Sequence, residues 1–216
     1  MLTASGGPFR GRTRDELDDV TPEEALAHPT WSHGAEDHDR LGDAREQGPR
    51  GDRGALPLRR RRTTGSRSSS TRRRSCTALV RFRDGAAIAH LGYPDMRVPI
   101  SYALTYPDAR RRPVPPLELH GTLEFHEPDT ETFPMLALAR EAGERGGTYP
   151  CVYNAANEVA VAAFLEGRIR LPRASPPLVR TSLGASTARP RATSTSCVEA
   201  DRSARRDAGA GAREWR

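Results

Sequence analysis

Few residues in this sequence have the type and the neighbours to do chemistry. Ser5 stands next to Gly6 and Gly7, and a hydroxyl group beside glycine amides suits the binding of an oxyanion such as a phosphate. His28 lies in the string HPTWS. Taken alone, a histidine at this place is more simply a surface side chain at the end of a helix. The residue types therefore offer an anion contact and assign no catalytic residue.

The cysteines form neither a metal motif nor a disulfide motif. Cys76, Cys151 and Cys197 are far apart and include no CxxC pair, so they support neither a structural zinc site nor a disulfide framework. The sequence also lacks a GxGxxG dinucleotide fingerprint. It contains no apolar run of membrane-spanning length and begins without the apolar core of a signal peptide. We therefore expect a cytoplasmic chain with reduced cysteines and no metal ligand of its own.

The positive charge is carried by arginine alone. The formal net charge is +6, and all 34 basic residues are Arg. An Arg/Ser-rich tract at residues 59–74 would bind RNA non-specifically and with strong salt dependence. Nucleic-acid surfaces commonly mix Lys and Arg, however, and a chain rich in Arg, Ala, Gly and Pro without Lys is typical of a very GC-rich coding sequence. Non-specific nucleic-acid binding is therefore the alternative function, not the first.

The elements that would position these residues begin before and end after an irregular insert. Within residues 1–35, Thr21, Pro22 and Glu24 fit an N-cap, a proline at the first helical position and a capping-box glutamate. Residues 36–78 are dense in Arg, Gly and Ser with almost no apolar periodicity. Such a segment buries too little apolar surface to offset the entropy of ordering, so we expect disorder.

Globular character returns over residues 79–171. Two short strands surround the turn Arg83-Asp84-Gly85, which is a hairpin signal. A helix-like apolar pattern follows in YPDMRVPISYALTYP, and an extended piece lies at GTLEFHEPD. FPMLALAREAGERGG predicts a helix closed by Gly146 and Gly147. NAANEVAVAAFLEGRI is the strongest helix pattern, and residues 172–216 then lose the pattern.

Two strings in this region, LGYPDMRVPISYALTYP and NAANEVAVAAFLEGRI, are highly specific. Together with LTASGGPFRG and TPEEALAHPTWS upstream, and in this order, they resemble 1-deoxy-D-xylulose 5-phosphate reductoisomerase. The resemblance covers roughly half of the chain. It implies NADPH, a divalent Mg²⁺ or Mn²⁺ ion that polarises a carbonyl, and a sugar-phosphate substrate that is rearranged and reduced to 2-C-methyl-D-erythritol 4-phosphate for non-mevalonate isoprenoid synthesis.

The resemblance also implies roles for single residues. Ser5 matches a serine that contacts the substrate phosphate, and His28 matches a substrate-contacting histidine. Trp31 matches an aromatic residue on the loop that closes the site, and Gly34 falls at a position that touches the nicotinamide cofactor. Met96, in PDMR, belongs to a stretch near the substrate, where a packing role fits equally well. No catalytic residue and no metal ligand of the family is assigned in this chain.

The resemblance is interrupted between Ala35 and Leu79. With codons chosen to fit, a shift of one nucleotide turns residues 46–56 into Asn-Lys-Gly-Leu-Glu-Val-Ile-Glu-Ala-His, and residues 36–40 into Lys-Ile-Thr-Ile. Both are the family's sequence. We therefore hypothesise that residues 36–78 are an out-of-register translation. A shift of two nucleotides over residues 191–197 indicates a second displaced stretch, from about Leu171 to Cys197.

The displacement would alter the site. In the family this segment supplies phosphate-binding residues and a glutamate ligand of the metal. Glu46 and Gln47 would stand in place of the phosphate-binding Asn and Lys, and Arg50 in place of the ligand glutamate. Both interactions are then reversed in sign, which costs several kcal/mol in a closed site. By resemblance the dinucleotide domain belongs upstream of Met1. We expect activity to be lost.

The expected architecture is α/β. It comprises a short N-terminal piece at residues 1–35, a long disordered Arg-rich insert at 36–78, an α+β catalytic-domain fragment at 79–171, and a disordered or remnant helical domain at 172–216. The resemblance implies a homodimer, and no membrane partner is expected.

Overall fold

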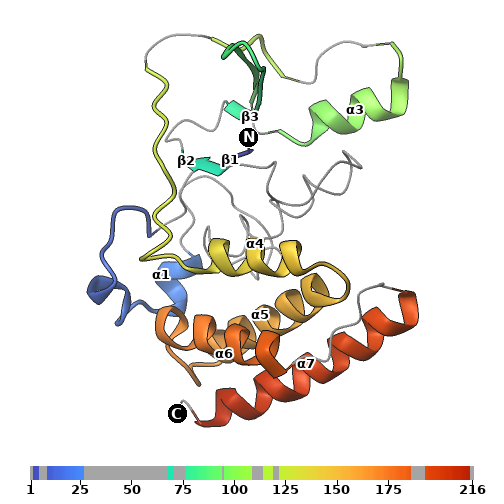
Figure 1. The fold of residues 1–216 in the computed structure, drawn as a ribbon. Coiled ribbons are helices and arrows are strands. Elements are labelled where there is room, and N and C mark those ends of the chain that lie inside the picture. Colours follow the sequence, from blue (N-terminus) through green and yellow to red (C-terminus); the bar gives the residue numbers. More distant parts are fainter. Residues whose placement is uncertain are drawn as a thin grey trace. The chain divides into compact units, whose positions relative to one another are not determined.

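The structure, a computed structural model, describes residues 2–4, 9–26, 68–70, 76–93, 95–108, 114–118, 122–185 and 193–214. The chain divides into two compact units, each described here by itself. The sheet unit comprises residues 1–5 and 68–127, and the helical unit comprises residues 6–67 and 128–216 (Figure 1). The predicted divisions at residues 35, 78 and 171 follow changes in composition and stay a prediction.

The helices and strands are mostly short in the first half of the chain and long in the second. In chain order they are β1 (Leu2–Ala4), η1 (Asp15–Leu17), α1 (Pro22–Leu26), β2 (Ser68–Ser70), β3 (Cys76–Arg81), β4 (Ala87–Leu91), α3 (Arg97–Thr105), α4 (Met135–Arg145), α5 (Tyr149–Leu165), α6 (Leu171–Ala185) and α7 (Ser194–Glu214). The predicted α/β class therefore holds only in a coarse form. The described residues are mostly helical, with a small sheet.

The sheet has the strand order β2-β1-β3-β4. β1 pairs in parallel with β2 and antiparallel with β3, and β3 pairs antiparallel with β4. The prediction of disorder over residues 36–78 is therefore wrong at its C-terminal end, because residues 68–70 and 76–78 are strand. Cross-strand hydrogen bonds to β1 and β4 offset the ordering entropy that local composition alone could not. Residues 36–67 and 71–75 lie outside the described part.

The predicted hairpin between β3 and β4 is confirmed. The amide of Phe82 donates to the carbonyl of Ala86 at 2.8 Å, and the carboxylate of Asp84 accepts from the amide of Ala86 at 2.9 Å. Gly85 has φ +92°, a value at which a residue with a Cβ is strained. An Asp that bonds two residues ahead and a Gly at positive φ together close the turn. The predicted extended piece at GTLEFHEPD shows a single bridge residue, His126, in its described part.

The apolar side chains of the sheet unit are exposed within this chain. On the hairpin, Val80 and Ile88 are 60% and 65% exposed, and on α3 Leu104 is 81% exposed. The predicted apolar pattern of α3 is thus a helix, as expected, but no buried residue occurs in it. The described part of the chain alone does not supply the core for this unit.

The helical unit holds the core. α5, the strongest predicted helix, packs against α4, α6 and α7 (Figure 1). Ala155, Ala156, Ala160 and Ala163 of α5 have no exposed surface. The hydroxyl of Tyr153 donates to the carbonyl of Met135 in α4 at 3.2 Å, in a buried position. Small side chains let helix axes approach closely, so α5 forms the centre of this unit.

Two helix-end predictions in this unit are confirmed. Thr21 and Glu24 form a capping box: the Thr21 amide donates to the Glu24 carboxylate at 3.1 Å, and the Glu24 amide donates to the Thr21 hydroxyl at 3.3 Å. α4 ends at Gly146, whose φ is +68° and whose amide donates to the carbonyl of Ala142 at 3.1 Å. Local signals therefore fix where α1 begins and α4 ends.

For residues 172–216 the sequence leaves disorder and a helical domain open, and the structure contains α6 and α7 there. α6 carries Pro176 and Pro177 in its interior. Each proline removes a backbone donor and crowds the carbonyl four residues earlier, at a cost of about 3 kcal/mol. Tertiary packing against α5 and α7 must offset this cost. No described helix is long and apolar enough to cross a membrane.

Candidate functional site

Most of the predicted site residues fall in parts of the chain that the structure does not describe. Ser5, His28, Trp31 and Gly34 lie outside the described residues, as do the displaced positions 46–50. Met96 is described. Two parts of the chain next to predicted site residues are described, each within its own unit: the turn between β4 and α3 that carries Met96 in the sheet unit, and the segments at Phe9 and α1 in the helical unit.

The β4–α3 turn is built around Asp95. Its carboxylate accepts a hydrogen bond from the backbone amide of Arg97 at 2.9 Å. The Arg97 guanidinium also donates to this carboxylate, with Nε at 3.0 Å from both oxygens and Nη2 in contact with Oδ2. The Asp95 amide donates to the carbonyl of Tyr93 at 2.8 Å. An aspartate that bonds the amide two residues ahead orders a turn before a helix, so this pair starts α3.

The Asp95–Arg97 pair is charged on both sides. Hydrogen bonds from the Arg97 side chain, and then from its amide, hold the pKa of Asp95 below its ordinary value, and the carboxylate in turn raises the pKa of Arg97. Both groups therefore stay ionised, and the guanidinium stands beside a carboxylate of opposite charge. In this arrangement the Arg97 side chain helps to order the turn.

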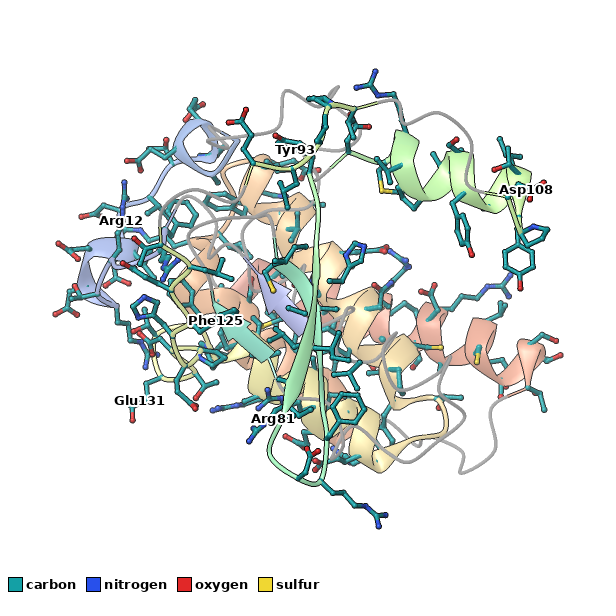
Figure 2. The ribbon with its side chains drawn as sticks, turned by 90° about the horizontal axis from the view of Figure 1, so that it is seen from above. Arg12, Arg81, Tyr93, Asp108, Phe125 and Glu131 are labelled. Carbon is teal, nitrogen blue, oxygen red and sulfur yellow. The ribbon has the colours of Figure 1, made fainter. Side chains whose placement is uncertain are left out.

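Met96 stands between these two residues and is 62% exposed. The hydroxyl of Tyr93 donates to the carbonyl of Pro116 at 3.4 Å, which ties the turn to the segment at residues 114–118. Figure 2 shows Tyr93 and Asp108 at opposite ends of the stretch that contains α3. The exposed thioether is an adaptable apolar surface. The turn thus presents the Met96 side chain as an apolar contact surface and presents no reactive group.

The described residues that flank the undescribed site segments are firmly packed. Phe9, four residues after Ser5, is 7% exposed, and Ala25, three residues before His28, is 5% exposed. Both belong to the core cluster that includes Phe164. Arg12 stacks over the Phe9 ring at 5.4 Å and pairs with Glu24 at 3.1 Å. The helical unit therefore anchors the chain at Phe9 and again at α1.

The described residues do not fit a metal ion. No group of three or more His, Cys, Asp or Glu side chains lies together among them. In the sheet unit His126 stands beside Glu124 at 3.4 Å, with both side chains about half exposed, and this is a pair of donors only. Mg²⁺ and Mn²⁺ prefer several oxygen ligands. The expectation that the chain supplies no metal ligand stays a prediction.

Two family models match the chain. One, described as the DXP reductoisomerase C-terminal domain, matches residues 91–207, and the other, described as the 1-deoxy-D-xylulose 5-phosphate reductoisomerase C-terminal domain, matches residues 1–37. Relatives of the same name include a protein of Thermomicrobium roseum, 47% identical over 85% of this chain and 48% of its own length. Another, of Ectopseudomonas mendocina, is 42% identical over 100% of this chain and 54% of its own.

Solved structures agree with the sequence matches. The reductoisomerase of Zymomonas mobilis in complex with NADPH superposes with a TM-score of 0.87 at 32% identity, covering 98% of this chain and 54% of that one. A DOX-P reductoisomerase in complex with NADPH, fosmidomycin and magnesium gives a TM-score of 0.82 at 28% identity, with the same coverage. These matches define the C-terminal part of an NADPH-binding class of enzyme.

The chain belongs to the 1-deoxy-D-xylulose 5-phosphate reductoisomerase family. It spans about half the length of the curated relatives it matches. The resemblance inferred from the two motif strings is confirmed by these comparisons. Sequence reasoning missed the Asp95–Arg97 pair, although an Asp two residues ahead of the first helical amide is a readable signal.

Proposed function

We propose that this chain carries the C-terminal part of a catalyst for the NADPH- and metal-dependent rearrangement and reduction of 1-deoxy-D-xylulose 5-phosphate, and that the chain in its present sequence does not complete that reaction. The observation that supports the first half is the match to the family over residues 91–207. This match includes the β4–α3 turn, the packed helices α4 to α6 and the first two thirds of α7. Ser5 and His28 would contact the substrate, and Gly34 the cofactor.

The second half rests on the out-of-register hypothesis. In the displaced middle segment, Glu46, Gln47 and Arg50 would replace residues that bind phosphate and metal. A carboxylate in place of a phosphate ligand, and a guanidinium in place of a metal ligand, repel the groups they should bind. The chain would therefore keep the fold of the family's C-terminal part and lose the side chains that bind phosphate and metal.

α6 supports the same hypothesis for the second displaced stretch. Beside its two interior prolines, Ser175 and Ser182 are 3% and 2% exposed. Neither hydroxyl has a hydrogen-bond partner among the described residues. A buried hydroxyl without a partner costs about 1–3 kcal/mol. In a sequence selected for its fold, local preference and packing agree, and a helix with these four residues at these positions departs from that agreement.

A substrate-turnover assay tests the proposal. The purified chain is mixed with NADPH, 1-deoxy-D-xylulose 5-phosphate and Mg²⁺ or Mn²⁺, and loss of NADPH absorbance is followed. We expect the rate of a blank without the chain. Turnover well above that blank would refute the loss of activity.

A binding comparison separates the displaced residues from other causes of inactivity. In a restored variant, residues 46–55 are replaced by Asn-Lys-Gly-Leu-Glu-Val-Ile-Glu-Ala-His. Fosmidomycin, which a related structure binds with magnesium, is titrated into both chains by calorimetry with Mg²⁺ present. The restored variant is expected to bind more tightly, since it regains phosphate and metal contacts. Equal binding by both chains would argue that the displaced segment does not belong to the site.

A further inference from the structure

Two of the three cysteines, Cys151 in α5 and Cys197 in α7, lie in helices that pack against each other. The two helices lie side by side (Figure 1). One core cluster holds Val152 and Ala156 of α5 with Ala204 and Ala208 of α7, and the other holds Ala160 and Phe164 of α5 with Ala212 of α7. Later residues of α5 thus meet later residues of α7. The helices run in the same direction.

A salt bridge fixes their level. The Arg205 guanidinium lies 2.6 Å from the Glu158 carboxylate and also bonds Asp201 at 2.8 Å. Cys151 precedes Glu158 by seven residues, and Cys197 precedes Arg205 by eight. At a rise of about 1.5 Å per residue, each cysteine lies nearly the same distance along its helix axis before the salt bridge. Cys151 and Cys197 therefore stand at one level near the start of each helix.

Cys151 also stands two turns before Glu158, on the side of α5 that meets Arg205 of α7. Seven residues are close to two full turns, so Cys197 shares a face with Ala204, which is 2% exposed, and Cys151 lies one turn before Ala155, which has no exposed surface. Alanines on both helices allow their axes to approach toward the short end of the usual range of about 8–10 Å. Both cysteines are half-buried, neither sealed in the core nor free in solvent.

We propose that Cys151 and Cys197 form a reversible disulfide that joins α5 to α7 when the chain meets an oxidised thiol such as glutathione disulfide. One cysteine thiolate attacks a sulfur of glutathione disulfide, which releases one glutathione thiolate and leaves a mixed disulfide on the protein. The second cysteine thiolate attacks the protein sulfur of that mixed disulfide and releases the second glutathione. Two protein thiols are oxidised, one glutathione disulfide is reduced to two thiols, and their protons pass to the departing glutathiones.

The bond would close a loop that contains the whole of α6. Because a crosslink restricts the unfolded chain more than the folded one, the oxidised protein is expected to melt at a higher temperature than the reduced protein. Cys76 is the internal comparison. It lies in the sheet unit and is 2% exposed, and burial raises the pKa of its thiol.

The experiment counts and locates the thiols of the full chain. Protein equilibrated in a glutathione redox buffer is unfolded in a maleimide reagent and weighed intact, and its peptides are then mapped without reduction. We expect one reactive thiol after oxidation and three after reduction, with a linked peptide that contains Cys151 and Cys197. Cys76→Ser should keep the linked peptide and the rise in Tm, and Cys151→Ser and Cys197→Ser should each abolish both.

Three results would overturn the proposal. They are three reactive thiols after oxidation, a linked peptide that contains Cys76, and glutathione adducts that persist on Cys151 and Cys197 without closing. If a serine variant fails to fold, the peptide map of the unaltered chain still decides among these results.

Discussion

Two glycines in α7 allow the packing of α6 against α7 to be measured. An added Cβ at Gly211 would stand 2.6 Å from Cδ2 of Leu178, whereas an added Cβ at Gly209 would meet no heavy atom within 4 Å. Both positions lie within the same helix. Gly209→Ala is therefore a matched control for Gly211→Ala, with the same change in helix propensity and without the contact.

The expected magnitudes follow from this difference. Replacing Gly by Ala in a helix interior stabilises it by about 0.8–1.0 kcal/mol, and Gly209→Ala should show this gain. At Gly211 the new carbon stands about 1 Å inside the 3.5–4.0 Å at which carbon atoms attract. Leu178 is 3% exposed and packs in the core cluster with Ala174 and Ala212, so its rotation away strains the core by about 1–3 kcal/mol. Gly211→Ala should therefore be about 1–3 kcal/mol less stable than Gly209→Ala.

Urea unfolding followed by circular dichroism measures both variants, and a double-mutant cycle with Leu178→Ala tests the cause. Leu178→Ala alone should destabilise the chain by about 2–5 kcal/mol. In that background the clash is absent, and Gly211→Ala should regain the stabilisation seen at Gly209. The coupling between the two sites should then be about 1–3 kcal/mol. If Gly211→Ala stabilises the unaltered chain as much as Gly209→Ala does, or if the coupling is near zero, the close approach of Gly211 to Leu178 is refuted.

Three further predictions concern α6, α1 and the Arg/Ser tract. Replacing both Pro176 and Pro177 by Ala should raise the free energy of unfolding by several kcal/mol, since each interior proline costs about 3 kcal/mol; unchanged stability in urea would contradict a helix through this segment. The hydrogen bond from Arg12, and then that from Thr21, lowers the pKa of Glu24, so its contribution to stability is present above the ordinary Glu pKa and is lost as the pH falls through the lowered value. Glu24→Gln should flatten the acid limb of stability against pH, and an acid limb identical to that of the unaltered chain would count against the ion pair. RNA retained on filters by the tract at residues 59–74 should fall steeply with salt and be indifferent to sequence; salt-resistant, sequence-selective retention would instead indicate a selected function.

The local features of this fold could be predicted from the sequence because they depend on residues that are neighbours in the chain. The capping box at Thr21, the turn at Gly85 and the helix end at Gly146 each require a few residues with particular side chains or φ values. The family motifs were readable for the same reason, because they are contiguous strings. Each of these predictions concerns fewer than about twenty consecutive residues.

Features that depend on residues distant in the chain could not be predicted from the sequence. β2 is strand because it pairs with β1, about sixty-six residues away in the chain, and its own serine-rich sequence predicts disorder. The level of Cys151 with Cys197 depends on the packing of α5 against α7, and the sequence separation of the two cysteines conceals it. The expected site residues Ser5, His28 and Gly34 lie outside the described residues, so their roles rest on resemblance.

In α6 the local sequence and the packing against distant residues favour different structures. Its local sequence opposes a helix, because two prolines interrupt it and two buried hydroxyls on one face lack partners among the described residues. Its helical state is instead supported from outside, by Leu178, Val179 and Leu183, which are at most 3% exposed against neighbouring helices. In a sequence selected for its fold, local preference and tertiary packing agree. They disagree strongly in α6, which lies within the second stretch that the out-of-register hypothesis covers, and such a disagreement is what a moved reading frame inside a retained fold predicts.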